Sequence, residues 1–278
     1  MTDMPRKPIR LIVTDLDGTL LNSAHEVSPR TEAAIHAAQA QGVAFTVATG
    51  KTFPSTTALI ERFDIQLPVI CGNGTSVHDI DGTVLYEDPI PPDLAVEAVH
   101  FAAEHGMTPV IYVAGGLLVP VWDENVDVLV EHHEPPPEVL PDLAPALRDG
   151  YHPHKIILMN QDLAKVSAFQ KLLEARFAGR GQVIRSGLPE VVELLPQGVS
   201  KATALRHILD HAGIEADETM TFGDNSNDLA MIKMAGIGVA MSNSPAYIRD
   251  AADFVTTSND EDGVALAIER FVLSPARN

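Results

Sequence analysis

The stretch LIVTDLDGTLL, Leu11 to Leu21, decides the fold of this chain. Its apolar start is typical of a short strand buried on both faces, as the strands of parallel sheets are. Asp15 and Asp17 come at the end of this strand, where α/β sheets bind their ligands. Gly18 lets the chain turn away after Asp17, so the two carboxylates are aimed differently. We therefore predict a catalytic edge at this point.

A near copy of the motif, DIDGTVL at 79–85, is expected to be a turn. It lies between two weak strand patterns, Ser76–Asp79 and Thr83–Glu87. The Asp81-Gly82 dipeptide between such runs is the usual signal of a two-residue hairpin. By the same reasoning, the first copy alone could be an acidic corner without chemistry. Its function has to be decided from other segments.

Three later segments carry groups suited to a phosphate and a cation. Thr49 and Gly50 follow a second buried-strand pattern, and a hydroxyl with free amides before a helix forms an anion site. Lys201 opens an amphipathic helical stretch, so its ammonium lies early in that helix. The segment Asp224–Asp228 reads DNSND and follows the strand pattern 219–223, which predicts a site for a hard cation.

These motifs together resemble those of the haloacid dehalogenase superfamily of aspartate-nucleophile phosphotransferases. Within it they resemble the Cof-type sugar-phosphatase-like group, which has a large inserted α/β cap of type C2B. The four superfamily motifs occur in order as DLDGTL, Thr49-Gly50, Lys201 and GDNSND, and the segments VICGNG and EDGVA resemble signatures of the subgroup. Members usually carry Arg after Thr-Gly. Lys51 stands here, so a bidentate guanidinium contact is not assumed.

The resemblance implies an α/β fold with a doubly wound, Rossmann-like parallel-sheet core and an inserted α+β cap domain. It assigns residues 1–82 and 191–278 to the catalytic core and residues 83–190 to the cap, which would select the substrate. The sequence pattern agrees, because strand-like runs alternate with helical ones, as in parallel sheets. The expected strands are Ile9–Thr14, Val43–Ala48, Pro68–Cys71, Thr219–Phe222, Gly236–Ala240 and Phe254–Thr256. The expected helices are Ser28–Gln41, Thr52–Phe63, Ser200–Ala212, Asp228–Met234 and Asp260–Phe271.

The insert has a different pattern. A helix is expected over Asp93–His105, a hairpin around Gly115-Gly116, and a strand, a helix and a second strand between Lys155 and Ser186. The segment Glu134–Pro145 holds five prolines and is expected to be irregular.

Other side chains with possible chemistry are expected to be structural. Cys71 follows a buried-strand pattern and is predicted to be an inert core thiol. The groups His132-His133-Glu134 and His152-Pro153-His154 have no partner motif at a metal-binding spacing, so we expect surface histidines there.

The composition of the chain limits the classes of molecule that it is expected to bind. The net charge of −19 argues against nucleic acid and against anionic membranes, which leaves small phosphorylated metabolites. A single cysteine excludes an intramolecular disulfide, and no apolar run resembles a signal peptide or a membrane span. A cytoplasmic protein, monomeric or homodimeric, is expected.

The resemblance also implies roles for individual residues. It makes Asp15, Asp17 and Lys201 catalytic, with Asp15 as the nucleophile and Asp17 as the acid and then the base. It implies Mg²⁺ held by Asp15, the Asp17 backbone carbonyl and Asp224, with Asp228 orienting these ligands. The residues implied to surround the phosphate are Leu16, Thr49, Gly50, Lys201 and Asn227.

The expected function is that of a Mg²⁺-dependent phosphoric monoester hydrolase, acting on sugar phosphates through a phosphoaspartate. A phosphatase of phosphorylated cofactors, such as pyridoxal phosphate or FMN, and a sugar phosphomutase would use the same core. A binding protein of the same fold without turnover is the alternative from another class. The alternative for Thr49, Asn227 and Asp228 is that they are helix caps, and for Lys201 that it is a solvated residue of a first helical turn.

Overall fold

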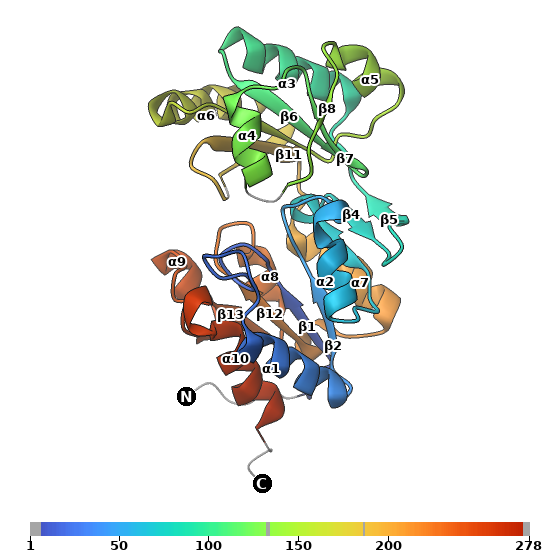
Figure 1. Cartoon of the computed structure of the whole chain (residues 1–278), viewed down its shortest axis with the longest axis vertical. Helices are drawn as coiled ribbons and strands as arrows, with labels where there is room; N and C mark the ends of the chain where they lie inside the picture. The colour runs from blue at the N-terminus through green and yellow to red at the C-terminus, as the bar shows by residue number, and fades with distance from the viewer. Residues whose placement is uncertain (1–6, 132–133, 186, 275–278) are drawn as a thin grey trace.

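The structure is a computed structural model of the chain, and it describes residues 7–131, 134–185 and 187–274. Two units are stacked along the long axis of the molecule (Figure 1). One is built on a five-stranded sheet and the other on a six-stranded sheet, which lies within a long insertion in the first. None of the helices in the described ranges is long and apolar enough to cross a membrane.

The five-stranded sheet is parallel throughout. Its strands, in order across the sheet, are β14 (Phe254–Val255), β13 (Ile237–Ala240), β12 (Thr219–Gly223), β1 (Leu11–Thr14) and β2 (Ala44–Val47). The register sets Thr14 opposite both Phe222 of β12 and Val47 of β2. The central strands therefore end at one level, and the residues that follow them share one edge of the sheet.

Helices cover both faces of this sheet. The helices of this parallel-sheet unit are α1 (Pro29–Ala40), α2 (Thr57–Arg62), α7 (Lys201–Ala212), α8 (Leu229–Met234), α9 (Ala246–Arg249) and α10 (Gly263–Ile268). Because strand residues alternate between faces, Ile12 packs in one core with α1 and α10, while Leu11 and Val13 pack in another with α7 and α8. Burial on both sides explains the continuous apolar run of β1, and the doubly wound α/β core is confirmed.

The near copy DIDGTVL at 79–85 is a turn, as predicted. Strands β4 (Ser76–His78) and β5 (Val84–Glu87) form an antiparallel hairpin, and Gly82 in its turn has a φ of 91°. With β3 (Val69–Cys71) they make a separate three-stranded sheet, in which β3 pairs with β4. The expected strand Pro68–Cys71 is joined to the parallel sheet by an isolated bridge between Ala48 and Ile70 and by the Thr46 hydroxyl, which donates to the Pro68 carbonyl at 2.7 Å.

The second unit, residues 92–196, is here called the inserted unit. Its strands in sheet order are β10 (Gly181–Ile184), β11 (Val191–Pro196), β9 (Lys155–Met159), β6 (Thr108–Val113), β7 (Gly116–Val119) and β8 (Glu138–Val139). Its helices within the described residues are α3 (Pro92–Glu104), α4 (Glu124–Glu131), α5 (Leu143–Asp149) and α6 (Leu163–Phe177). The helix α3, the β6–β7 hairpin and the order β9, α6, β10 agree with the sequence-based expectation.

The end of the insertion differs from the expected boundary between residues 190 and 191. Strand β11 pairs with β9 and β10, with Val191 opposite Met159 and Leu194 opposite Val183. The chain thus returns to the parallel-sheet unit only after Pro196. The segment VVELLP is apolar enough to suit either sheet, so its pattern could not decide between them.

Some helices also differ from the sequence pattern. The expected helix Thr52–Phe63 is a short 3₁₀ turn (Phe53–Thr56) followed by α2, and Asp260–Phe271 is similarly divided around α10. Helix α4 was not anticipated. Helix α5 starts inside the segment Glu134–Pro145 that we expected to be irregular, because Asp142 caps it by accepting from the Ala144 amide.

Candidate functional site

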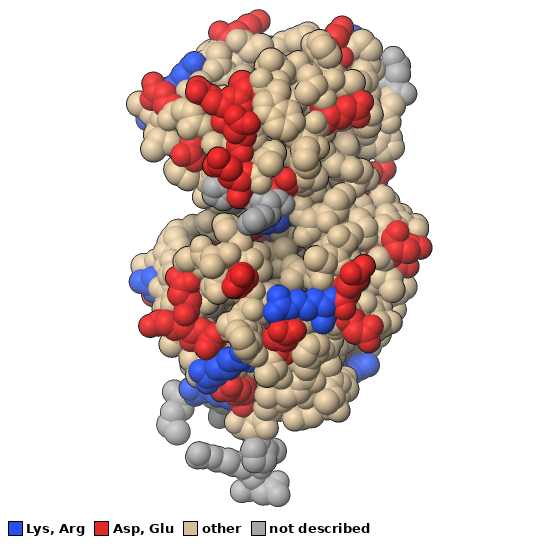
Figure 2. Space-filling view, in the orientation of Figure 1, with Lys and Arg blue, Asp and Glu red and all other residues tan. Residues whose placement is uncertain are grey.

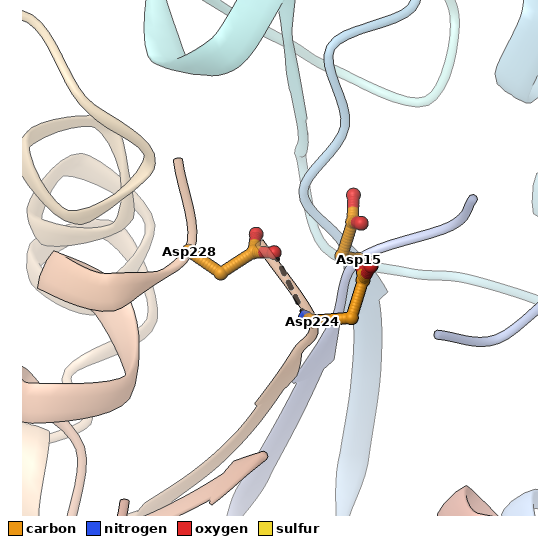
Figure 3. A group of neighbouring side chains, drawn as sticks. All are labelled: Asp15, Asp224 and Asp228. Carbon is orange, nitrogen blue, oxygen red and sulfur yellow. Dashed lines mark hydrogen bonds between the residues drawn. The ribbon is translucent and has the colours of Figure 1, made fainter. Parts of the chain in front are cut away.

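Three aspartates meet at the carboxyl edge of the parallel sheet (Figure 3). Asp15 follows β1, Asp224 follows β12, and Asp228 precedes α8. One carboxylate oxygen of each lies within 4.8 Å of the others. The Asp15 amide donates to the Phe222 carbonyl at 3.0 Å, which continues the ladder between the two strands and fixes their spacing. We call Asp15, Asp224 and Asp228 the acidic cluster.

Lys201 is fully buried beside this cluster. Its ammonium donates to Asp15 Oδ1 at 2.5 Å and to Asp228 Oδ1 at 2.6 Å. It is the first residue of α7, and a capping box between Ser200 and Thr203 fixes the start of that helix. The interpretation of Lys201 as a solvated residue of a first turn is therefore wrong.

The cluster carries more negative charge than the lysine balances. Burial, followed by the nearby Asp228, raises the pKa of Asp15 well above its usual range. The same two causes raise the pKa of Asp224 to about 6. Burial alone would lower the pKa of Lys201, but Asp15 and Asp228 raise it above its usual value, so the lysine stays charged. One ammonium faces three carboxylates, and a bound cation would relieve their repulsion.

Asp228 is held on both of its oxygens. Oδ1 receives Lys201, while Oδ2 accepts from the backbone amides of Asp224 and Asn225 at 3.1 and 3.0 Å. A Cβ at Gly223 would lie 2.3 Å from the Asp228 Cβ, so only glycine fits there. Asp228 thus positions the loop that carries Asp224.

The turn after Asp17 brings the main chain against Asp224. Gly18 has a φ of 78°, and a Cβ on it would lie 2.7 Å from Asp224 Oδ2. The Thr19 hydroxyl donates to Asp224 Oδ1 at 3.1 Å. The DGT part of the motif therefore supports the carboxylate of a distant segment, and this explains why glycine and threonine follow Asp17.

Asp17 lies apart from the acidic cluster, at the side of a cavity. Its side chain is 42% exposed, with Lys51 Nζ 3.5 Å and His25 Nδ1 3.8 Å from its carboxylate oxygens. Lys51, which replaces the usual arginine, is thus placed against Asp17 rather than in solvent. His25 was not anticipated from the sequence; it sits in a tight loop with a φ of 58°.

Of the residues predicted to surround a phosphate, Gly50 and Asn227 line the same cavity as Asp15. Asn227 Nδ2 donates to Asn73 Oδ1 at 2.9 Å, and Asn227 Oδ1 is buried without a hydrogen-bond partner. The Thr49 hydroxyl accepts from the Lys51 amide at 3.1 Å and so shapes the loop. The Leu16 side chain packs in the hydrophobic core, which leaves only its backbone near the edge.

The cavity has a volume of about 320 Å³ and lies between the two units. Figure 2 shows the narrow waist at this level and the acidic side chains spread over both units. The parallel-sheet unit contributes Asp15, Asp17, Lys51, Asn73 and Asp224, among others. The inserted unit contributes Tyr112, Glu134, Lys155, Ile157, Val191 and Glu193, among others.

The residues of the inserted unit were missed in the sequence, although a signal was present. Lys155 begins the strand KIILM and Glu193 interrupts the strand VVELLP, where a buried charge is costly unless it has a role. Asn73, in the motif VICGNG, was quoted for its resemblance but given no role. In the structure it bonds to Asn227 on one side and to Glu193 on the other.

Among the side chains expected to be structural, Cys71 agrees with the expectation and His154 differs from it in its burial. Cys71 is buried, and burial raises the pKa of its thiol far above the usual value, as befits an inert group. His154 is not at the surface as expected: it is buried and its Nε2 lies 3.0 Å from Glu87 Oε2. His132 and His133 lie outside the described residues.

The chain is similar in sequence and in structure to haloacid dehalogenase-like hydrolases. A family model described as haloacid dehalogenase-like hydrolase matches residues 12–268. A solved haloacid dehalogenase-like hydrolase from Bacteroides thetaiotaomicron matches with a TM-score of 0.84 and 30% identity, covering 94% of this chain and 99% of that one.

Several bacterial relatives are named phosphatases. One from Bacillus subtilis, 5-amino-6-(5-phospho-D-ribitylamino)uracil phosphatase YcsE, is 28% identical over 265 residues, covering 95% of this chain and 96% of that protein. A chloroplastic protein of Arabidopsis thaliana named endoribonuclease YBEY is 28% identical over 271 residues. That match covers 94% of this chain but only 46% of the longer plant protein.

Proposed function

Because this chain belongs to the haloacid dehalogenase-like hydrolase family, we propose that it is a Mg²⁺-dependent phosphatase of small phosphorylated metabolites, most of all sugar phosphates. The observation that carries this proposal is the acidic cluster beside Lys201. The carboxylates of Asp15 and Asp224 meet the buried ammonium of Lys201 at one edge of the sheet, and both aspartates line a cavity between the units. Phosphoryl transfer requires positioning and neutralisation of charge more than anything else.

The donor set of the acidic cluster fits Mg²⁺. Carboxylate and carbonyl oxygens are the ligands this ion prefers, and the excess negative charge at the cluster favours a divalent cation. Asp15, Asp224 and the Asp17 backbone carbonyl would hold it, while Asp228 keeps the Asp224 loop in place. The bound ion would neutralise charge on the phosphoryl oxygens.

In the first half-reaction, a carboxylate oxygen of Asp15 forms a bond to phosphorus. The bond from phosphorus to the ester oxygen breaks, and Asp17 gives its proton to the departing alcohol. Lys201 donates to Asp15 Oδ1, which favours the ionised form of this carboxylate and fixes its direction. Lys51 lies 3.5 Å from Asp17 and is in reach of the same leaving group.

In the second half-reaction, Asp17 takes a proton from water, whose oxygen attacks the phosphorus of the phosphoaspartate. The bond from phosphorus to the Asp15 oxygen breaks, which releases inorganic phosphate and restores the carboxylate. The Gly50 amide and the second Nδ2 hydrogen of Asn227, whose first hydrogen is donated to Asn73, would bind the non-reacting phosphoryl oxygens.

The inserted unit would serve as the cap domain. It covers the cavity opposite the catalytic edge, so its side chains face the alcohol part of a bound ester rather than the phosphate. A second candidate substrate has one supporting observation, since the B. subtilis relative is named for a ribitylaminouracil phosphate. A cavity of about 320 Å³ is at the lower end of the usual range for small-molecule sites.

The proposal is tested with p-nitrophenyl phosphate, assayed with Mg²⁺ and again with EDTA. We expect hydrolysis that depends on Mg²⁺, followed by a panel of sugar phosphates and ribitylaminouracil phosphate ranked by kcat/KM. Hydrolysis that persists unchanged in EDTA would refute a metal-dependent mechanism.

Removing one cation ligand gives a more specific prediction. Asp224→Ala should raise the Mg²⁺ concentration for half-maximal activity by about tenfold or more, because a carboxylate ligand is lost while Asp15 and Asp17 remain. Isothermal titration calorimetry with Mg²⁺ measures the same affinity without turnover. Asp210→Ala, an exposed aspartate on α7, is the matched control and should bind Mg²⁺ as the wild type does. Equal Mg²⁺ affinity in the Asp224→Ala variant would move the metal elsewhere.

A further inference from the structure

The sheet face of the inserted unit that looks into the cavity is apolar except for a few side chains. Ile157 and Val191 lie on this face and belong to one hydrophobic cluster. Because strand residues alternate, Lys155 on β9 and Glu193 on β11 share the face with them, and Glu193 stands directly opposite Ile157. Tyr112 on β6 stands opposite Lys155.

Lys155 and Glu193 form a buried ion pair at 3.0 Å, and each side chain is about 95% buried. Such a pair is not needed for stability, because apolar residues of similar size are often as stable or more so. Here an apolar pair would simply extend the cluster around Ile157. The two charges are therefore better explained by the cavity they line than by the packing of the sheet.

Fixed partners hold these charges in place. Asn73 donates to Glu193 Oε2 at 2.8 Å, the same oxygen that receives Lys155. Asn227, at the phosphate end, donates to Asn73 in turn. The Lys155 ammonium also lies 4.2 Å from the centre of the Tyr112 ring. A continuous set of hydrogen bonds therefore runs from the phosphate end of the cavity to the wall of the inserted unit.

A second carboxylate lines the same wall. Glu134 is buried, accepts from the Tyr112 hydroxyl at 3.1 Å, and accepts from Ser55 of the parallel-sheet unit at 3.1 Å. Burial, then Glu134 and Glu193, raise the pKa of Tyr112 well above its usual range, so this hydroxyl stays a donor. The wall thus presents two carboxylates against one ammonium.

We propose that Glu193, with Lys155 and Glu134, selects esters whose alcohol part carries hydroxyl or amino hydrogens and no second anionic group. Buried carboxylates accept such hydrogens, while a second phosphate or carboxylate would face Glu134 and Glu193 in a region that water screens poorly. Lys155 pairs with Glu193 and can itself donate to a hydroxyl oxygen. This inference rests on the proposed phosphatase function and names its substrate class.

The proposed selectivity is tested with three substrates and with Glu193→Gln, a variant that removes the negative charge of this side chain. The substrates are sorbitol 6-phosphate, which is rich in hydroxyls, p-nitrophenyl phosphate, which has none, and fructose 1,6-bisphosphate, which has a second phosphate. In the wild type, kcat/KM should be higher for sorbitol 6-phosphate than for the bisphosphate. In Glu193→Gln, the ratio of kcat/KM for sorbitol 6-phosphate to that for p-nitrophenyl phosphate should fall by about tenfold, the scale of one hydrogen bond to a charged group. Discrimination against the bisphosphate should shrink.

Two further variants serve as controls. Glu174→Gln changes an exposed glutamate on α6, outside the cavity, and should leave every ratio as in the wild type. If Glu193→Gln does not fold, as judged by circular dichroism, the double variant Lys155→Met/Glu193→Leu replaces the whole pair by apolar residues. It should fold and should lose the preference for the hydroxyl-rich ester.

The possible failures are distinguishable. If the folded Glu193→Gln or double variant keeps the wild-type ratios among the three esters, this inference is overturned and the phosphatase function stands. If the wild type prefers the bisphosphate, the inference is likewise overturned. If the wild type hydrolyses none of the three esters with Mg²⁺, the proposed function itself fails, and the inference fails with it.

Discussion

Asp15→Asn should abolish turnover, with a loss in kcat of about 10⁴-fold or more, the scale on which removal of a covalent nucleophile acts. An amide cannot attack phosphorus and cannot carry the phosphoryl group. The fold should persist, because asparagine has the same shape and Lys201 still pairs with Asp228. Steady-state hydrolysis of p-nitrophenyl phosphate at saturating Mg²⁺ measures the effect.

The chain supplies its own matched control for this substitution. Asp79 occupies the corresponding position in the near copy DIDGT, but in the structure it belongs to the hairpin between β4 and β5. Asp79→Asn should therefore leave kcat unchanged. Asp17→Asn should keep some phosphorylation from esters with good leaving groups, since these need no proton. Near wild-type kcat in Asp15→Asn would refute its role as the nucleophile.

Lys201→Met should reduce both stability and activity. The substitution keeps the volume but leaves Asp15 and Asp228 buried without their cation, and breaking a buried ion pair in this way costs about 3–5 kcal/mol. Urea unfolding in EDTA measures the loss as a lower midpoint. Activity should fall as well, because Asp15 loses the ammonium that favours its ionised form.

Lys233→Met is the control for this prediction, since Lys233 is an exposed lysine on α8. It should unfold within about 0.5 kcal/mol of the wild type, as surface substitutions usually do. If Lys201→Met unfolded like this control, the buried contacts of Lys201 would not stabilise the protein.

The meeting of Asp15 and Asp224 at one edge could be predicted from sequence, because both residues follow strands of one parallel sheet. Asp15 and Asp224 each come directly after a buried strand, and parallel strands end at a common edge. Lys201 comes from a helix start, so its contact with Asp15 rested on the family resemblance. The pattern at Ser200 predicted where that helix begins, and the structure confirms this.

The wall of the cavity could not be predicted in the same way. Glu193 and Lys155 belong to antiparallel strands far apart in the chain, and their meeting depends on the register of β9 and β11. A sequence pattern gives the faces of a strand but not its partners. The boundary at residue 191 was wrong for the same reason, since an apolar strand can join either of two sheets.

The most direct test of the account is a search for the covalent intermediate. The protein is mixed with radiolabelled p-nitrophenyl phosphate and Mg²⁺, quenched in acid within milliseconds, digested, and mapped by mass spectrometry. We predict label on the peptide that contains Asp15, at a level that decays with turnover and is absent from Asp15→Asn. Stable label on another residue, or turnover without any label on Asp15 at the shortest times, would contradict the phosphoaspartate mechanism.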